Sequence, residues 1–148
     1  MKKVLKILMC QVLMIPFLSN AQQGLNLENV KKIVEAVNMK DATLYVKNFH
    51  TDIKVFLYED QEFKLKVSGS QALFKNRAAH FKKHPKVRNI IKHLVEIDEK
   101  VIIHDRVWLS PDVPEGSDIV EIYTFDGAGK IVRVDVIQQK NLFAKEGG

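Results

Sequence analysis

The sequence predicts an α+β domain in which three N-terminal helices pack against a largely antiparallel sheet of about six strands. Apolar residues recur at helical spacing in the first half of the chain, and strand-like alternation dominates from Val87 to Gln138. A hairpin signal joins the last two strands: within Asp118–Gln138, two runs rich in Ile, Val, Tyr and Phe flank Asp126-Gly127-Ala128-Gly129. Helices segregated from such a sheet define the α+β class.

The helices are predicted from apolar spacing and from capping residues. The first covers about Leu27 to Met39, with Asn26 as its N-cap. Asp41 caps a second, short helix. Ser70 caps a third helix, which ends at His84-Pro85 because the residue before a proline disfavours helical geometry.

The strands follow from alternation. One strand contains Ile53, Val55 and Leu57, a second covers residues 63–67, and residues 59–62 form the turn between them. Four more strands are predicted at about 87–97, 101–109, 118–125 and 130–138. Gly69 and Gly129 stand at element junctions, where we expect positive φ or close backbone approach.

Residues 1–21 are predicted to be a secretory signal peptide. Lysines at positions 2, 3 and 6 precede an apolar stretch from Ile7 to Leu18, and Ser19-Asn20-Ala21 supplies small residues for cleavage before Gln22. The stretch is shorter than the roughly 20 apolar residues that span a membrane. We therefore expect an exported protein, periplasmic or secreted, with no integral membrane segment after cleavage. Residues 22–138 form its domain and residues 139–148 a C-terminal tail.

Composition excludes several chemistries. Cys10 lies in the predicted signal peptide, so the 127-residue mature chain has neither a disulfide nor a thiol nucleophile. It keeps 20 basic and 18 acidic residues, a balance that argues against a nucleic-acid partner. His80 and His84 are four residues apart, but Phe81 stands where a metalloprotease motif needs glutamate. We predict no metal and no cofactor.

One segment has a strong charge asymmetry. From Phe63 to Val95 the chain has nine lysines and arginines and no acidic residue. Such a segment attracts anionic ligands or a membrane surface, or it is a solvated helix face balanced by acids elsewhere.

The order of these elements resembles the nuclear transport factor 2-like superfamily. The local matches are Asp41 opening the second helix, Asp52-Ile53 opening the first strand, Gly69-Ser70-Gln71-Ala72-Leu73 opening the third helix and Gly129-Lys130-Ile131-Val132 opening the last strand. Over about Leu27–Gln138 the chain is most similar to the SnoaL-like and ketosteroid isomerase-like branch. The resemblance implies a cystatin-like cone, in which the helices pack on a curved sheet around an apolar pocket.

The resemblance also assigns family site positions. The tyrosine and the base of the steroid isomerases fall on Ile33 and Leu57, and only the second acid keeps a carboxyl, as Glu121, so that isomerisation is not expected here. The His and Asp of the polyketide cyclases fall on Val134 and Val136. A one-residue slip with a bulge would be needed to bring Asp135 inward.

Glu121 lies between Ile119 and Tyr123 on the strand face that we predict to be internal; the alternative places Val120, Ile122 and Thr124 inside. An internal glutamate needs a raised pKa or a cationic partner, because a buried unpaired charge is costly.

The strand at 101–109 offers two different faces. His104, Arg106 and Trp108 share one face, whereas Asp105 shares the other with aliphatic residues. Polar groups in an apolar setting are typical of ligand pockets, although the aliphatic face could equally be the core. We expect Arg106 to face inward and to pair with Glu121 or to hold a ligand carboxylate.

These inferences predict an exported SnoaL-like protein that binds a small apolar or carboxylate-bearing molecule without catalysis. Its pocket would comprise Glu121, Tyr123, His104, Arg106, Trp108, Ile33, Leu57 and Val134. One alternative is a cofactor-free isomerase or cyclase that uses Glu121, His104 or Asp135 for proton transfer. Another is a homodimeric interaction module built on the outer sheet face, which predicts a cone plugged by Phe and Trp.

Overall fold

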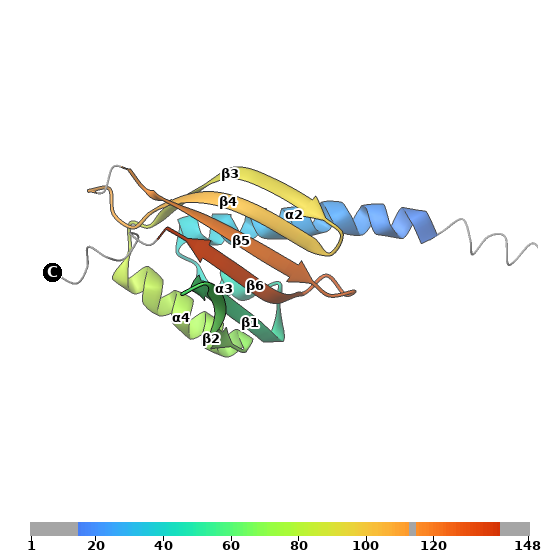
Figure 1. Ribbon diagram of the computed structural model, residues 1–148, viewed down its shortest axis with the longest axis horizontal. Coiled ribbons are helices and arrows are strands. Elements are labelled where there is room, and N and C mark those ends of the chain that lie inside the picture. Colours follow the sequence, from blue (N-terminus) through green and yellow to red (C-terminus); the bar gives the residue numbers. More distant parts are fainter. Residues whose placement is uncertain (1–14, 113–114, 140–148) are drawn as a thin grey trace, which may run out of the picture.

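The computed structural model describes residues 15–112 and 115–139, with side chains from Gly24 onward. Three helices and six strands follow one another in the predicted order, which confirms the α+β class (Figure 1). They are α2 (Ile15–Met39), α3 (Ala42–Val46), β1 (Phe49–Glu59), β2 (Glu62–Ser68), α4 (Ser70–Lys83), β3 (Arg88–Ile97), β4 (Lys100–Trp108), β5 (Ser117–Phe125) and β6 (Ile131–Gln138).

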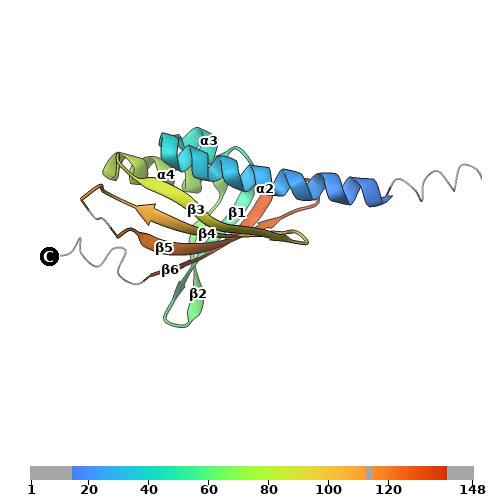
Figure 2. The ribbon, with the colours of Figure 1, turned by 90° about the horizontal axis from the view of Figure 1, so that it is seen from above.

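The six strands form one curved sheet with the order β2-β1-β6-β5-β4-β3. All neighbouring strands are antiparallel except β1 and β6, which are parallel. Register shifts interrupt β1 between Val55 and Phe56 and β3 between Ile91 and His93, and such bulges bend a strand and increase its twist. The helices α2, α3 and α4 lie along one side of this sheet (Figure 2). We call the side that they cover the inner face and the opposite side the outer face.

Strand alternation fixes which side chains reach the core. Val101, Ile103 and Val107 of β4 are buried, as are Tyr123 and Phe125 of β5. They meet the apolar side of α2, where Val30, Ile33, Val34 and Ala36 are buried as well. Odd-numbered residues of β4 and β5 therefore face inward and even-numbered residues face outward.

Two predicted helix caps are wrong, and one is confirmed. Helix α2 begins at Ile15, so Asn26 is a buried residue inside the helix rather than its cap. Ser70 is the first residue of α4, and Gly69, with φ of 91°, occupies the cap position. The Gly69 N–H donates to the Ile53 carbonyl as the chain leaves β2. The Asp41 side chain accepts from the Leu44 N–H at 2.9 Å, as predicted.

The β5–β6 hairpin is formed as predicted. Asp126 Oδ1 accepts hydrogen bonds from the N–H groups of Ala128 and Lys130, each at 2.9 Å, and Gly129 has φ of 76°. The carboxylate thus closes the turn locally, and glycine provides the left-handed backbone.

No helix among the described residues is long and apolar enough to cross a membrane. Most of the predicted signal peptide, including Cys10, and the predicted tail beyond Gln139 lie outside the described residues.

Candidate functional site

A cavity of about 460 Å³ lies between the inner face of the sheet and the helices. Its size falls within the range of small-molecule sites, which are concave and mainly apolar with a few polar groups. Much of its wall is aliphatic, from Ile33, Val34 and Val37 of α2, Val55 and Leu57 of β1, Val107 of β4, Ile119 of β5 and Val136 of β6.

The polar residues that line this cavity include five on different elements: Tyr45, Arg77, Asn89, Asp105 and Glu121. We call them, together with Tyr123, the polar cluster. Side chains on α3, α4, β3, β4 and β5 thus meet at one place, although their sequence positions are up to 78 residues apart. Only the closure of the sheet over the helices brings them together.

Asp105 is the most deeply buried acid of the cluster, with 1% of its surface exposed. Asn89 Nδ2 donates to Asp105 Oδ2 at 2.6 Å, whereas Asp105 Oδ1 has no hydrogen-bond partner among the described residues. Burial, and next the charge of Glu121, raise the pKa of Asp105 to about 7. The cavity therefore holds a carboxyl group that can donate or accept a proton near neutral pH.

Asn89 is held in place by α2. Asn38 Nδ2 donates to the Asn89 carbonyl at 2.9 Å, and Asn38 Oδ1 accepts from the Asn89 N–H at 2.8 Å. The Asn38 side-chain amide thus pairs with both the N–H and the carbonyl of Asn89, which lies on the edge strand β3. It fixes the position from which Asn89 reaches Asp105.

Glu121 and Tyr123 form the second part of the cluster. The Tyr123 hydroxyl donates to Glu121 Oε2 at 2.6 Å. Burial raises the pKa of Glu121, against the hydrogen bond from Tyr123 and the charge of Arg77, which lower it. Burial likewise raises the pKa of Tyr123 well above its ordinary value, so this phenol stays protonated and remains a donor.

Arg77 supplies the cation of the cluster. Its guanidinium lies 5.1 Å from the centre of the Tyr45 ring, within the range of a cation–π contact. Its Nε has no hydrogen-bond partner among the described residues. Three residues that line the cavity thus each have one buried polar atom with no hydrogen-bond partner among the described residues: Arg77, Asn89 and Asp105.

Four of the residues predicted for the pocket line this cavity: Glu121, Tyr123, Ile33 and Leu57. Val134 is buried in the adjoining core, and Val136, one inward position further along β6, takes a place in the wall.

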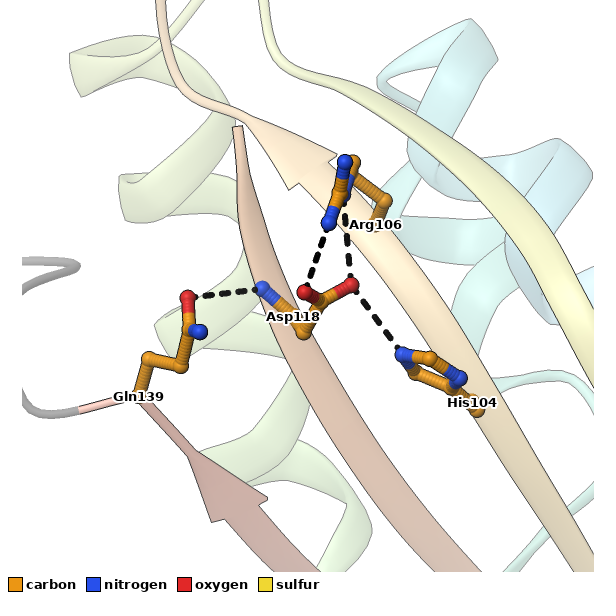
Figure 3. A network of polar contacts seen from close by, with 4 residues as sticks. All are labelled: His104, Arg106, Asp118 and Gln139. Carbon is orange, nitrogen blue, oxygen red and sulfur yellow. Dashed lines mark hydrogen bonds and ion pairs between the residues drawn. The ribbon is translucent and has the colours of Figure 1, made fainter. Parts of the chain in front are cut away.

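Three predicted pocket residues instead lie on the outer face. His104, Arg106 and Trp108 occupy even positions of β4, so alternation turns them away from the cavity. Arg106 donates to both carboxylate oxygens of Asp118, at 3.2 and 2.7 Å, and His104 Nε2 lies 3.0 Å from Asp118 Oδ1 (Figure 3). These contacts lower the pKa of Asp118 to about 2. The predicted Arg106–Glu121 pair is therefore wrong, and Asp118 is the partner of Arg106.

Asp135 lies on the outer face too. β6 pairs with β5 without a slip at this position, with Glu121 opposite Val136 and Ile122 opposite Asp135. Arg133 binds the Asp135 carboxylate at 2.8 to 3.0 Å. The bulge that would have turned Asp135 inward is not formed.

Asp105, Asn89 and Arg77 were not predicted as site residues from the sequence. For Asp105 a signal exists, because it is the single acid in an alternating run of Val101, Ile103, Val107 and Leu109. Asn89 and Arg77 give no such signal, since their role depends on β3 and α4 lining the same cavity as β4. No group of three or more metal-binding side chains occurs within the described part of the chain.

Comparison with known proteins shows which solved structures share this fold. A scan against protein-family models and a search of curated proteins gave no match. A cystatin-fold protein from Novosphingobium aromaticivorans is 26% identical over 76% of this chain and 97% of its own, with a TM-score of 0.65. A SnoaL-like protein of unknown function from Burkholderia thailandensis is 12% identical, covering 79% of this chain and 96% of its own, also with a TM-score of 0.65.

A candidate SnoaL-like polyketide cyclase from Jannaschia sp. CCS1 has a TM-score of 0.67 at 13% identity, over 84% of this chain and 90% of its own. Structural likeness over most of both chains decides the fold. The chain has the nuclear transport factor 2-like fold. In this nuclear transport factor 2-like domain, the inner sheet face and the helices enclose the cavity, and the polar cluster is what distinguishes its wall from a plain core.

Proposed function

We propose that the protein is an exported binding protein that holds a small, mainly apolar molecule in the cavity without transforming it. The observation that carries this proposal is a 460 Å³ space lined by aliphatic side chains and by a few convergent polar groups with unmade hydrogen bonds. Burying apolar ligand surface supplies affinity, and the polar cluster fixes orientation. The cavity also argues against a cone plugged by Phe and Trp, since Trp108 faces outward.

Export belongs to the same proposal and rests on the signal-peptide pattern of residues 1–21. A binding protein outside the cytoplasm would meet molecules of the cell's surroundings.

Calorimetric titration with decanol, a neutral apolar probe, tests the binding proposal. Val136→Phe places a ring in the cavity and should weaken decanol binding by about tenfold or more, because overpacking costs roughly 1 to 3 kcal/mol. Ile137→Phe is the matched control, since the neighbouring side chain is 39% exposed and does not line the cavity. Equal affinities for the two variants, or no binding to the unaltered protein, would contradict binding in this cavity.

Catalysis is the second candidate function, and Asp105 is the observation that favours it. A cavity carboxyl with a pKa of about 7 suits general acid–base chemistry near neutral pH, as a cofactor-free isomerase or cyclase needs. The acids would be Asp105 and Glu121, because His104 and Asp135 lie on the outer face.

Deuterium exchange at the α-carbon of methyl octyl ketone distinguishes the two functions. An acid–base enzyme should accelerate exchange, with a rate that rises as pH increases through about 7 and is lost in Asp105→Asn. A binding protein should bind the ketone and leave its exchange rate unchanged.

The outer face supports the homodimer alternative. Cross-strand partners there form an apolar band, with Val95 opposite Ile102, Ile102 opposite Ile122, and Val120 opposite Ile137. Val95 and Ile137 are 48% and 39% exposed. A contiguous exposed apolar surface is typical of an interaction site. Sedimentation velocity of the unaltered protein and of Ile137→Glu tests this: a dimer that dissociates in the variant supports the alternative, and a monomer in both removes it.

A further inference from the structure

The cavity has two carboxyl groups together with Arg77 at its closed end and exposed lysines at its open end. The acids Asp105 and Glu121 belong to the polar cluster, where Asp105 is almost fully buried. Lys66 and Lys83 line the same cavity but are exposed to solvent, so they form its rim. His80, also in the wall, lies one helical turn before Lys83. A molecule in the cavity would therefore meet cations where it leaves the protein.

The two rim lysines come from elements that contact each other, β2 and α4. Asn76, His80 and Lys83 follow one another at spacings of four and three, so they share one face of α4, and all three line the cavity. Lys66 joins this face from the neighbouring strand. The rim is thus a fixed feature of helix and strand rather than of a loop.

Lys66 remains available to a ligand although it is paired. Its Nζ lies 2.6 Å from Glu59 Oε2, and the two side chains are 41% and 38% exposed. An ion pair this exposed contributes little and exchanges readily with other anions. A ligand carboxylate at the rim can bind Lys66 in place of Glu59 or beside it.

Apart from the rim lysines and Arg77 of the polar cluster, the cations of this segment do not line the cavity. Lys75 and Lys82 are exposed on α4 and do not line it. The run from Phe63 to Val95 without acidic residues therefore includes three sets: a general surface charge, the rim lysines, and Arg77 inside the cavity. The surface charge attracts anions at long range, whereas the rim lysines and Arg77 can touch a molecule inside.

The closed end does not suit an anion. The cation at this end, Arg77, already interacts with Glu121, whose pKa its charge lowers. Asp105 and Glu121, in their charged forms, would repel an anionic group beside them. A ligand hydroxyl could instead donate to Asn89 Oδ1 or Asp105 Oδ1, and a ligand carbonyl could accept from Asp105 in its protonated form. The anionic end of a ligand belongs at the rim.

We infer that the ligand is an anionic amphiphile, with its apolar body inside the cavity and a carboxylate or equivalent single anionic head between Lys66 and Lys83. This inference rests on the proposed binding function and adds the ligand class to it. The carboxylate-binding site that the sequence predicted at Arg106 would then lie at the rim, since Arg106 is bound to Asp118 on the outer face.

Calorimetric titrations with decanoate, decanol and decylammonium at low salt test the inference, because the three probes share their apolar chain and differ in head charge. Decanoate should bind about tenfold more tightly than decanol, and decylammonium more weakly than decanol. Added salt should weaken decanoate binding and leave decanol binding unchanged.

Paired lysine variants locate the charge effect. Lys66→Gln with Lys83→Gln should lower decanoate affinity about tenfold and change decanol affinity less than about twofold. Lys75→Gln with Lys82→Gln removes the same charge from outside the cavity and should leave both affinities within about twofold.

The outcomes separate the two proposals. Decanol binding with no preference for decanoate, or an equal loss in both lysine pairs, overturns the anionic ligand class and leaves the binding function standing. Failure of all three probes to bind the unaltered protein contradicts the binding function itself.

Discussion

Asp105 shows how one residue changes the character of an otherwise aliphatic strand face. Its neighbours on that face, Ile103 and Val107, are buried core residues, and Asp105 is as buried as they are. A buried carboxylate costs several kcal/mol unless it is paired, and Asn89 satisfies only one of its oxygens. The side chain therefore retains a proton over a pH range in which an exposed aspartate is ionised.

The stability of the protein should fall between about pH 4 and pH 7. Asp105 ionises near 3.8 in the unfolded chain and near 7 in the folded protein, so in this window the folded state holds the additional proton. Its stabilisation is complete below the unfolded pKa and is lost as pH rises through the folded one, by up to about 4 kcal/mol. Urea titrations at several pH values measure this slope.

Asp105→Asn should flatten that slope and make the protein more stable than the unaltered chain at pH 8, because the amide needs no ionisation. Asp98→Asn, which replaces an exposed carboxyl, should leave the slope unchanged. A variant with the original pH dependence would show that Asp105 is not the titrating group.

The outer-face network makes a second prediction at this scale. Arg106 binds Asp118 and is separated from Glu121 by the sheet. In double-mutant cycles, alanine replacements of Arg106 and Asp118 should be non-additive, because each removes the partner of the other. Replacements of Arg106 and Glu121 should be additive. Coupling between Arg106 and Glu121 in denaturant unfolding would restore the pair expected from the sequence.

At the scale of elements, two glycines determine how strands connect to their neighbours. Gly69 lies between β2 and α4, and Gly129 precedes β6; their φ values, 91° and 76°, are both left-handed. Valine in this region is strained, because its branched Cβ clashes with the backbone. The turns therefore depend on residue identity even where space is available.

Gly69→Val and Gly129→Val should each destabilise the protein by about 1 to 3 kcal/mol. Gly127→Val is the control within the same hairpin, because Gly127 has no positive φ and no neighbouring atom within 4 Å of an added Cβ. Thermal unfolding of the three variants measures the difference, and equal melting temperatures would mean that the backbone is not constrained at these positions.

At the scale of the whole molecule, the inner face encloses a cavity and the outer face carries paired charges around an apolar band. The residues of α2 that reach the core begin with Asn26 and Val30, whereas the predicted cleavage site precedes Gln22. Removal of residues 1–21 would therefore shorten α2 without deleting a core contact of the described side chains.

Expression in a secreting bacterium should yield a mature protein that begins at Gln22, because Ser19 and Ala21 suit signal cleavage. Intact-mass measurement of the exported protein checks this. A mass that includes residues 1–21, or a lipid on Cys10, would contradict the predicted signal peptide.

The sequence by itself determined the elements, their order and the hairpin, because these depend on local spacing and turn chemistry. The cap at Asp41 and the positive φ of Gly69 and Gly129 are local backbone features, so these roles could be predicted. The inward direction of Glu121 and Tyr123 was also predictable, since alternation leaves only two choices for a strand.

Only the tertiary structure decided which face of β4 lines the cavity, because that choice depends on which side of the sheet the helices cover. One strand face presented His104 and Arg106, and the other presented Asp105 among aliphatic residues. Burial beneath the helices selected the second face; it brought Asn89 of β3 to Asp105 and Arg77 of α4 to the same cavity. Such meetings are set by long-range packing, which a local pattern does not encode.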